Sequence, residues 1–164
     1  MKLPTVSLLV LGIALLAGEA LGQQNTLKEQ IVGTWTVVSL INERNGKQIE
    51  PFGPNPKGYF MFDSSGHFST HIIRSRRPKF ANRDNPTPRE SKAVVEGTIT
   101  AFGTYTVNET DHSVFMQIIG SSFPTWDNTY QKRFITITGD GMKYVNPTPS
   151  TGGGTAMVIL KRAE

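Results

Sequence analysis

Polar and apolar side chains alternate along much of the chain after residue 33, with the two-residue period of half-buried β-strands. Clusters of Gly, Pro, Asn, Asp and Ser, which favour turns, separate most of these stretches. The pattern predicts eight strands, over residues 34–43, 58–63, 67–74, 98–107, 113–119, 131–138, 142–145 and 155–162.

Two short helices are also predicted. Asn25 can cap a helix over residues 26–32, and Thr87-Pro88-Arg89-Glu90 combines a capping box with proline at the first helical position. The second helix is expected to run to Glu96. Neither helix is long enough to connect parallel strands, so neighbouring strands should pair antiparallel. Because closure removes exposed edges, the predicted fold is all-β, an eight-stranded antiparallel closed barrel with a short N-terminal helix and a short lid helix.

The turn Ser64-Ser65-Gly66 sets the register of one hairpin. If Asp63 lies opposite His67, Phe62 faces Phe68 on the same surface. That surface then carries Phe60, Phe62, Phe68, Ile72 and Arg74, and the other carries Tyr59, Met61, His67, Ser69 and His71.

The strand over residues 98–107 bears on whether the barrel is filled. One of its faces carries Ile99, Ala101, Gly103, Tyr105 and Val107. If this face points inward, Ala101 and Gly103 leave room for a small ligand. Alternatively, both small residues lie opposite bulky phenylalanines and the interior is packed solid.

The first residues are typical of a secretory signal peptide: Lys2, an apolar run from Val6 to Ala17, and small residues before Gln23. The run is shorter than the roughly 20 residues that cross a bilayer. We expect residues 1–22 to be the signal peptide and residues 23–164 to form one domain. The mature protein is expected to be secreted or periplasmic, with no stable membrane insertion.

Composition excludes several kinds of chemistry. The chain has no Cys, and therefore no disulfide, thiol nucleophile or Cys-based zinc site. His67 and His71 would lie on one strand face about 13 Å apart, too far for a common metal ion. We predict no metal and no cofactor, and we find no catalytic triad, phosphate-binding loop or nucleotide fingerprint.

The net charge is +4, and basic residues gather in one segment: Arg74, Arg76, Arg77, Lys79 and Arg83. This cluster could meet an anionic ligand, a membrane surface or nucleic acid, or form a solvated loop. Only Phe80 is aromatic there, so we predict no nucleic-acid binding.

Gly33-Thr34-Trp35 resembles the Gly-x-Trp signature of lipocalins, in which an arginine near the last strand lies over the tryptophan; Arg162 is the candidate here. The motifs PFGPNPKGY, GHFSTHIIRSRRPKFA, AFGTYTV, GSSFPTW and GGGTAMVI resemble, in order and spacing, those of the lipocalin-like domain family. The resemblance covers residues 27–162. It implies a calycin-type barrel with a cavity, and it carries no agreed catalytic residues.

The candidate ligand-binding residues are those expected at the lining and mouth of the barrel: Phe60, Phe62, Phe68, Arg74, Ala101, Gly103, Tyr105 and Trp126. Arg74 would orient an acidic group at the end of the phenylalanine surface. Alternatively, Arg74 lies outside the barrel and pairs with Asp84 or Glu90.

The leading hypothesis is a barrel that binds a small, largely apolar ligand carrying an acidic or carbonyl group. One alternative is a cofactor-independent isomerase or cyclase acting on a polyketide or terpenoid, with Arg74, Tyr105 and His71 as candidate catalytic residues. A second is a structural envelope protein with a filled barrel. Asn108-Glu109-Thr110 is a glycosylation acceptor if the source is eukaryotic. The oligomeric state does not follow from the sequence.

Overall fold

The computed structural model describes residues 25–149 and 153–164, and the expected signal peptide lies outside them. The strands are β1 (Gly33–Arg44), β2 (Lys47–Ile49), β3 (Lys57–Phe62), β4 (His67–Ile73), β5 (Thr98–Asn108), β6 (Ser113–Ser121), β7 (Thr129–Thr138), β8 (Gly141–Asn146) and β9 (Thr155–Arg162). The helices are α1 (Leu27–Ile31), α2 (Pro88–Glu96) and the 3-10 helix η1 (Pro124–Trp126).

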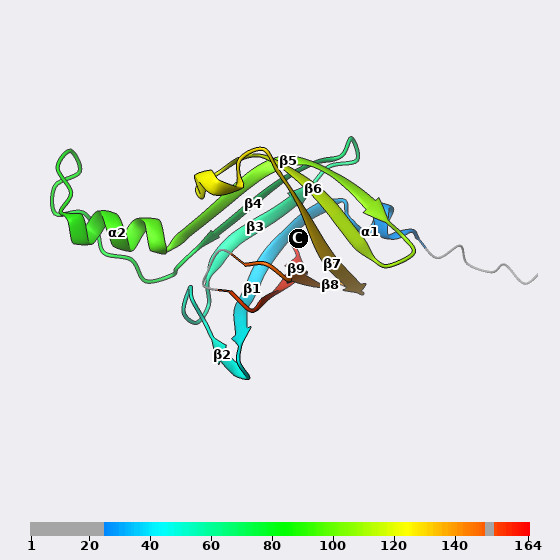
Figure 1. The fold of residues 1–164 in the computed structure, drawn as a ribbon, viewed down its shortest axis with the longest axis horizontal. Coiled ribbons are helices and arrows are strands. Elements are labelled where there is room, and N and C mark those ends of the chain that lie inside the picture. Colours follow the sequence, from blue (N-terminus) through cyan, green and yellow to red (C-terminus); the bar gives the residue numbers. More distant parts are fainter. Residues whose placement is uncertain (1–24, 150–152) are drawn as a thin grey trace, which may run out of the picture.

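The strands of this described part form one antiparallel sheet in the order β2-β1-β3-β4-β5-β6-β7-β8-β9. Pairing of β1 with β9 closes the sheet on itself (Figure 1). β2 pairs only with the end of β1. The closed barrel therefore consists of β1 and β3 to β9, which confirms the predicted eight-stranded fold.

The β3–β4 hairpin has the register predicted from its turn. Phe60 is paired with Thr70, and Phe62 with Phe68. The phenylalanines are buried, whereas Tyr59 on the opposite face is exposed. The alternation of side chains along these strands thus separates the barrel interior from solvent.

Trp35 and Arg162 close one end of the barrel. Trp35 is fully buried, and its indole N–H donates to the Ile31 carbonyl at 2.8 Å. The Arg162 guanidinium lies 4.1 Å from the centre of the Trp35 ring and donates to the carbonyls of Gln30 and Val32. This arrangement joins the first strand, the last strand and α1, and it confirms the Arg162 prediction.

The N-cap of α1 is Thr26, so the prediction of Asn25 was wrong. The Thr26 hydroxyl accepts the Glu29 N–H, and the Glu29 carboxylate accepts the Thr26 N–H. This reciprocal pair satisfies two backbone donors, whereas a cap one residue earlier would leave Glu29 out of reach of the cap.

α2 begins as predicted, with a capping box between Thr87 and Glu90 and with Pro88 at its first position. None of its residues is buried, and it projects beyond the barrel end opposite α1 (Figure 1). The structure therefore does not place this helix over the interior as a lid. Within residues 25–149 and 153–164, no helix is long and apolar enough to cross a lipid bilayer.

Gly103 belongs to the barrel wall. The β5–β6 register shifts between Phe102 and Gly103, and a Cβ at Gly103 would lie 1.9 Å from the Gln117 carbonyl oxygen. Glycine is thus needed because two backbones approach closely at a bulge. The expectation that Gly103 leaves room for a ligand was wrong.

Candidate functional site

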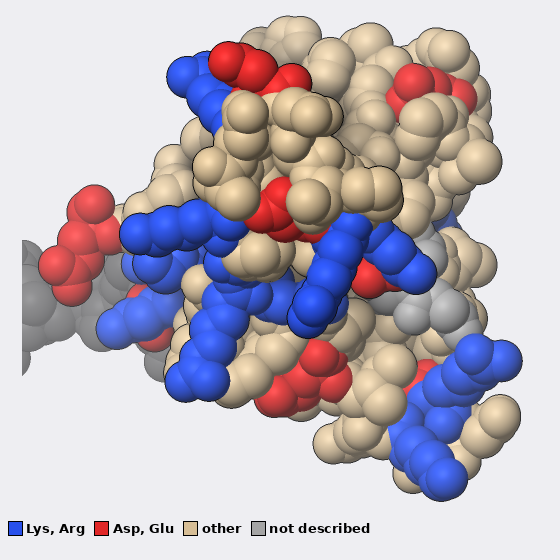
Figure 2. All heavy atoms as spheres, turned by 90° about the vertical axis from the view of Figure 1, so that its left-hand side faces the viewer, with Lys and Arg blue, Asp and Glu red and all other residues tan. Residues whose placement is uncertain are grey.

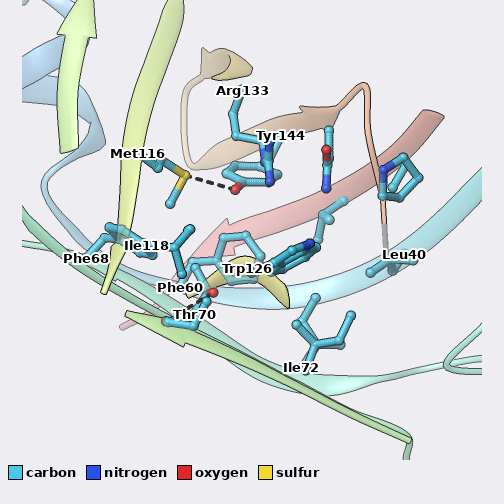
Figure 3. A pocket seen from close by; sticks show the side chains of 16 residues that line it. Leu40, Phe60, Phe68, Thr70, Ile72, Met116, Ile118, Trp126, Arg133 and Tyr144 are labelled. Atoms are coloured by element: carbon cyan, nitrogen blue, oxygen red, sulfur yellow. Dashed lines mark hydrogen bonds between the residues drawn. The ribbon is translucent and has the colours of Figure 1, made fainter. Parts of the chain in front are cut away.

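A cavity lies inside the barrel, and Figure 3 shows the side chains around it. Most of its lining is apolar and comes from inward-facing strand positions, among them Leu40, Phe60, Ala101, Ile118 and Val158. The volume that the centre of a water-sized sphere can occupy in this cavity is about 50 Å³. On the same measure, one water molecule needs roughly 10–15 Å³. The interior is therefore not completely filled by its own side chains.

The cavity extends toward the barrel end where β4 finishes and β5 starts. Ile72 and Ile99 pair across these two strands, and both line it. Trp126 of η1 also lines it, and this half-buried side chain packs against Phe123 with ring centres 5.6 Å apart. The 3-10 helix therefore supplies an aromatic rim to the cavity.

The cavity contains a buried cation, Arg133 of β7, which is only 2% exposed. Its Nη1 donates to the Lys132 carbonyl at 2.8 Å, and its Nη2 donates to the Gln131 side-chain oxygen. Its Nε is buried with no hydrogen-bond partner. The guanidinium thus retains an unused donor in a largely apolar site.

No internal carboxylate balances this charge within the described residues. Every Asp and Glu there is exposed except Glu90, which is half-buried at α2. The ion pairs of this part of the chain join His67, Lys92, Lys132 and Lys161 to acids on the surface. An unpaired buried cation costs several kcal/mol, so Arg133 is energetically unfavourable without a partner.

Tyr144 of β8 provides a second polar group on the cavity wall. Its buried hydroxyl donates to the Met116 sulfur at 3.2 Å, a weak acceptor. Burial raises the pKa of Tyr144, while the nearby charge and hydrogen bonding of Arg133 act in the opposite direction. The hydroxyl therefore stays protonated at neutral pH and remains a donor. The Tyr144 and Arg133 side chains lie beside each other (Figure 3).

Basic residues are concentrated in the connection from β4 to β5, at the barrel end toward which the cavity extends. Figure 2 looks onto this end and shows Lys and Arg side chains gathered on it. The segment holds Arg74, Arg76, Arg77, Lys79, Arg83, Arg89 and Lys92, against Asp84, Glu90 and Glu96. An anion that approaches this end meets an attractive field.

The sequence profile of the lipocalin-like domain family matches residues 32–162, from the end of α1 to the end of β9. The chain belongs to the lipocalin-like domain family. No curated protein matches it. Among solved structures, it is similar to a redesigned β-barrel with 18% sequence identity and a TM-score of 0.48, over 85% of this chain and 96% of that chain.

In this lipocalin-like barrel, several of the residues predicted from the sequence line the cavity. Phe60 and Phe68 come from the β3–β4 hairpin, Ala101 from β5, and Trp126 from η1. The structure brings them together around one space although they are distant in the sequence. Their contact with a ligand stays a prediction.

Phe62 and Tyr105 do not line the cavity. Their rings pack against each other at a centre-to-centre distance of 5.2 Å, and the Tyr105 hydroxyl donates to the Asp63 carbonyl at 2.7 Å. Burial raises the pKa of Tyr105. Tyr105 therefore anchors the β3–β4 turn and offers no hydroxyl to a ligand.

Arg74 and His71 lie outside the cavity as well. Arg74 follows β4, where its Nη2 donates to the Pro51 carbonyl at 2.7 Å. His71 is exposed on the outer face, with its Nε2 2.8 Å from the Ser69 hydroxyl. None of the residues named for the isomerase or cyclase alternative, Arg74, Tyr105 and His71, lines the cavity.

Sequence reasoning missed Arg133. The signal that could have found it is phase, because Arg133 alternates with the apolar Ile135 and Ile137 along β7. The adjacent Lys132 made the pair look like surface charge. Lys132 points outward, where its ammonium lies 5.1 Å from the Phe115 ring centre and pairs with Asp111.

In the part of the chain that the structure describes, no group of three or more His, Cys, Asp or Glu side chains is placed to hold a metal ion. Asn108 ends β5, and its side-chain oxygen accepts the Thr110 N–H at 2.9 Å. Its glycosylation stays a prediction.

Proposed function

We propose that this lipocalin-like barrel binds a small, largely apolar molecule in its cavity, with an acidic or carbonyl group of that molecule at Arg133. The observation that carries the proposal is the partly enclosed apolar space between Phe60, Ala101 and Ile118. Such a space, lined mainly by apolar side chains with a few convergent polar groups, is the usual form of a small-molecule site.

The arrangement of polar groups supports an oriented ligand. Arg133 and Tyr144 lie together on one wall, while Ile72, Ile99 and Trp126 line the part of the cavity toward the end of β4. A ligand with a polar end and an apolar body can satisfy the donors and cover the apolar wall at the same time. The open space counts against a filled barrel of purely structural use.

We also propose that binding takes place outside the cytoplasm. This part of the proposal rests on the charge and hydropathy of residues 1–22, which are typical of a signal peptide. N-terminal sequencing of the protein exported by its own source would identify the cleavage site.

The test uses a neutral apolar fluorophore, N-phenyl-1-naphthylamine, titrated into the purified domain. Ala101→Leu adds bulk to the cavity wall and should weaken binding at least tenfold. The matched control is Thr106→Leu, which adds an apolar side chain to the solvent face of the same strand and should leave the affinity unchanged. Near-ultraviolet circular dichroism checks that both variants keep the native fold.

Saturable binding that only Ala101→Leu weakens would support the cavity as the site. Equal affinity in all three proteins would show that the fluorophore binds elsewhere and would contradict the proposal. Native mass spectrometry of protein purified from its own source then identifies any small molecule that the cavity retains.

A further inference from the structure

The surroundings of Arg133 bear on which polar group the proposed ligand carries, an acidic group or a neutral carbonyl. Its side chain is 2% exposed and lines the cavity, and its Nε is buried without a hydrogen-bond partner. Its other contacts are to neutral groups, namely the Lys132 carbonyl, the Gln131 side-chain oxygen and the Tyr144 side chain. These contacts satisfy donors but leave the positive charge uncompensated.

A neutral carbonyl would accept a hydrogen bond from this guanidinium but would not balance its charge. A carboxylate does both, because it carries a full negative charge and two oxygens that match the spacing of guanidinium donors. The Tyr144 hydroxyl now donates to the Met116 sulfur. It can instead donate to a ligand oxygen beside Arg133, which is a stronger acceptor. Both groups therefore favour an anionic oxygen over a neutral one.

The single charged side chain of the cavity and its apolar walls restrict the charge and the body of the ligand. Among the described residues that line the cavity, Arg133 is the one charged side chain. A dianion such as phosphate would keep one negative charge unpaired in an apolar space, where its desolvation is not compensated. The remaining walls, which include Phe60, Ile72 and Ile118, offer apolar contact.

We propose that the ligand is an apolar monocarboxylate, held by its carboxylate at Arg133 and by its body against the apolar walls of the cavity. This inference rests on the proposed function and names the ligand class. In this inference Arg133 selects ligands with an anionic group. The Tyr144 hydroxyl is a second donor to the same carboxylate.

The experiment compares octanoate with octanamide by isothermal titration calorimetry. The two molecules share their chain and differ in whether the polar end is charged. Charge-assisted hydrogen bonds are worth roughly 1.5–3 kcal/mol, which corresponds to an affinity ratio of about tenfold to hundredfold. The wild-type protein should show this preference for octanoate.

Arg133→Met replaces the guanidinium with an unbranched apolar side chain and so removes the charge and its donors. It should reduce octanoate affinity to that of octanamide or below, while octanamide affinity changes less than threefold. Arg133→Lys should retain part of the preference, because it keeps the charge but loses the planar pair of donors. The wild-type comparison needs no variant, so it decides the question even where a variant fails to fold.

Equal affinity of wild-type protein for octanoate and octanamide would overturn the monocarboxylate inference and leave cavity binding in place. An unchanged preference in a folded Arg133→Met protein would overturn the role of Arg133. If neither molecule nor N-phenyl-1-naphthylamine binds, the proposed function fails together with the inference. Each failure is therefore recognised by a different result.

Discussion

Arg133 and Arg74 differ in what surrounds their guanidinium groups. Arg74 lies beyond the end of β4 and donates to the Pro51 carbonyl, with part of its side chain in solvent. Arg133 is enclosed by the barrel and has no described carboxylate as a partner. Water can solvate the charge of Arg74, whereas the charge of Arg133 needs a partner inside the protein.

This difference gives a stability prediction for the protein without ligand. Arg133→Met should unfold at the same temperature as the wild type or at a higher one, because replacing an uncompensated buried ion with an apolar side chain is often neutral or stabilising. Thermal unfolding followed by circular dichroism measures the change. A loss of more than about 3 kcal/mol would indicate that Arg133 is a structural residue with a partner in the folded chain.

Tyr105 is expected to contribute to stability, unlike Arg133, because its hydroxyl has a hydrogen-bond partner within the fold. Tyr105→Phe removes the hydrogen bond to the Asp63 carbonyl and should lower the free energy of unfolding by about 0.5–1.5 kcal/mol. Octanoate affinity should not change, since Tyr105 does not line the cavity. Urea denaturation and calorimetry of the same variant separate these effects, and a loss of binding at unchanged stability would place Tyr105 in the site.

Among the structural elements, the β3–β4 hairpin contains a carboxylate that organises its turn. Asp63 Oδ1 accepts the His67 N–H and the Ser65 hydroxyl, each at 2.8 Å. These hydrogen bonds, that from the His67 backbone first, lower the pKa of Asp63 to about 2 from 3.8. The folded state therefore favours the ionised carboxylate.

The stability that Asp63 contributes is complete above the unfolded-state pKa of 3.8 and is lost as the pH falls through about 2. Asp63→Asn mimics the protonated side chain, so the wild type should be more stable than the variant at neutral pH. The two stabilities should converge as the pH is lowered across this window. Denaturation of both proteins at a series of pH values tests the prediction, and a constant difference down to the lowest pH would contradict it.

η1 contributes apolar contact to the site. Trp126 lines the cavity at its rim and is held by the backbone contact of its N–H with the Phe123 carbonyl at 2.8 Å. Trp126→Ala should weaken octanoate and octanamide by the same factor, about tenfold or more, because it removes apolar contact from both. A selective loss of octanoate binding would instead assign Trp126 a polar role.

For the whole molecule, the basic end affects how fast an anion arrives. The segment between β4 and β5 carries Arg76 and Arg77, which follow the end of β4 at Ile73, at the barrel end toward which the cavity extends. Stopped-flow association of octanoate should slow as salt rises from about 10 mM to about 100 mM, where the Debye length falls from about 30 Å to about 10 Å.

Two double variants with the same loss of charge separate local steering from net charge. Arg76→Gln with Arg77→Gln should flatten the salt dependence of association and leave dissociation unchanged. Lys143→Gln with Lys161→Gln, which neutralises exposed residues of β8 and β9, should alter it less. Equal effects of both pairs would mean that the basic segment has no special part in association.

The sequence was sufficient to predict the barrel because its strands alternate strongly and their turns set the register, as at Phe62 and Phe68. The site was harder to predict. Arg74 is in phase with the inward Ile72, but β4 ends at Ile73, so alternation no longer fixes its direction. Gly103 is small because of a backbone approach from β6, which no property of β5 alone reveals.

Arg133 illustrates why the interior chemistry escaped sequence reasoning. Its position in the alternation is visible, but an arginine next to a lysine is ordinarily assigned to the surface, because burying an unpaired charge is costly. That cost depends on what all the other strands supply, and here they supply no carboxylate among the described residues. The information lies in the closed barrel and not in β7.

A crystal structure of the protein with bound octanoate tests the role of the cavity most directly. We predict the carboxylate within hydrogen-bond distance of the Arg133 guanidinium and the Tyr144 hydroxyl, with the alkyl chain against Phe60 and Ile118. Octanoate bound on the outer surface, or inside the barrel with its carboxylate turned away from Arg133, would contradict this assignment.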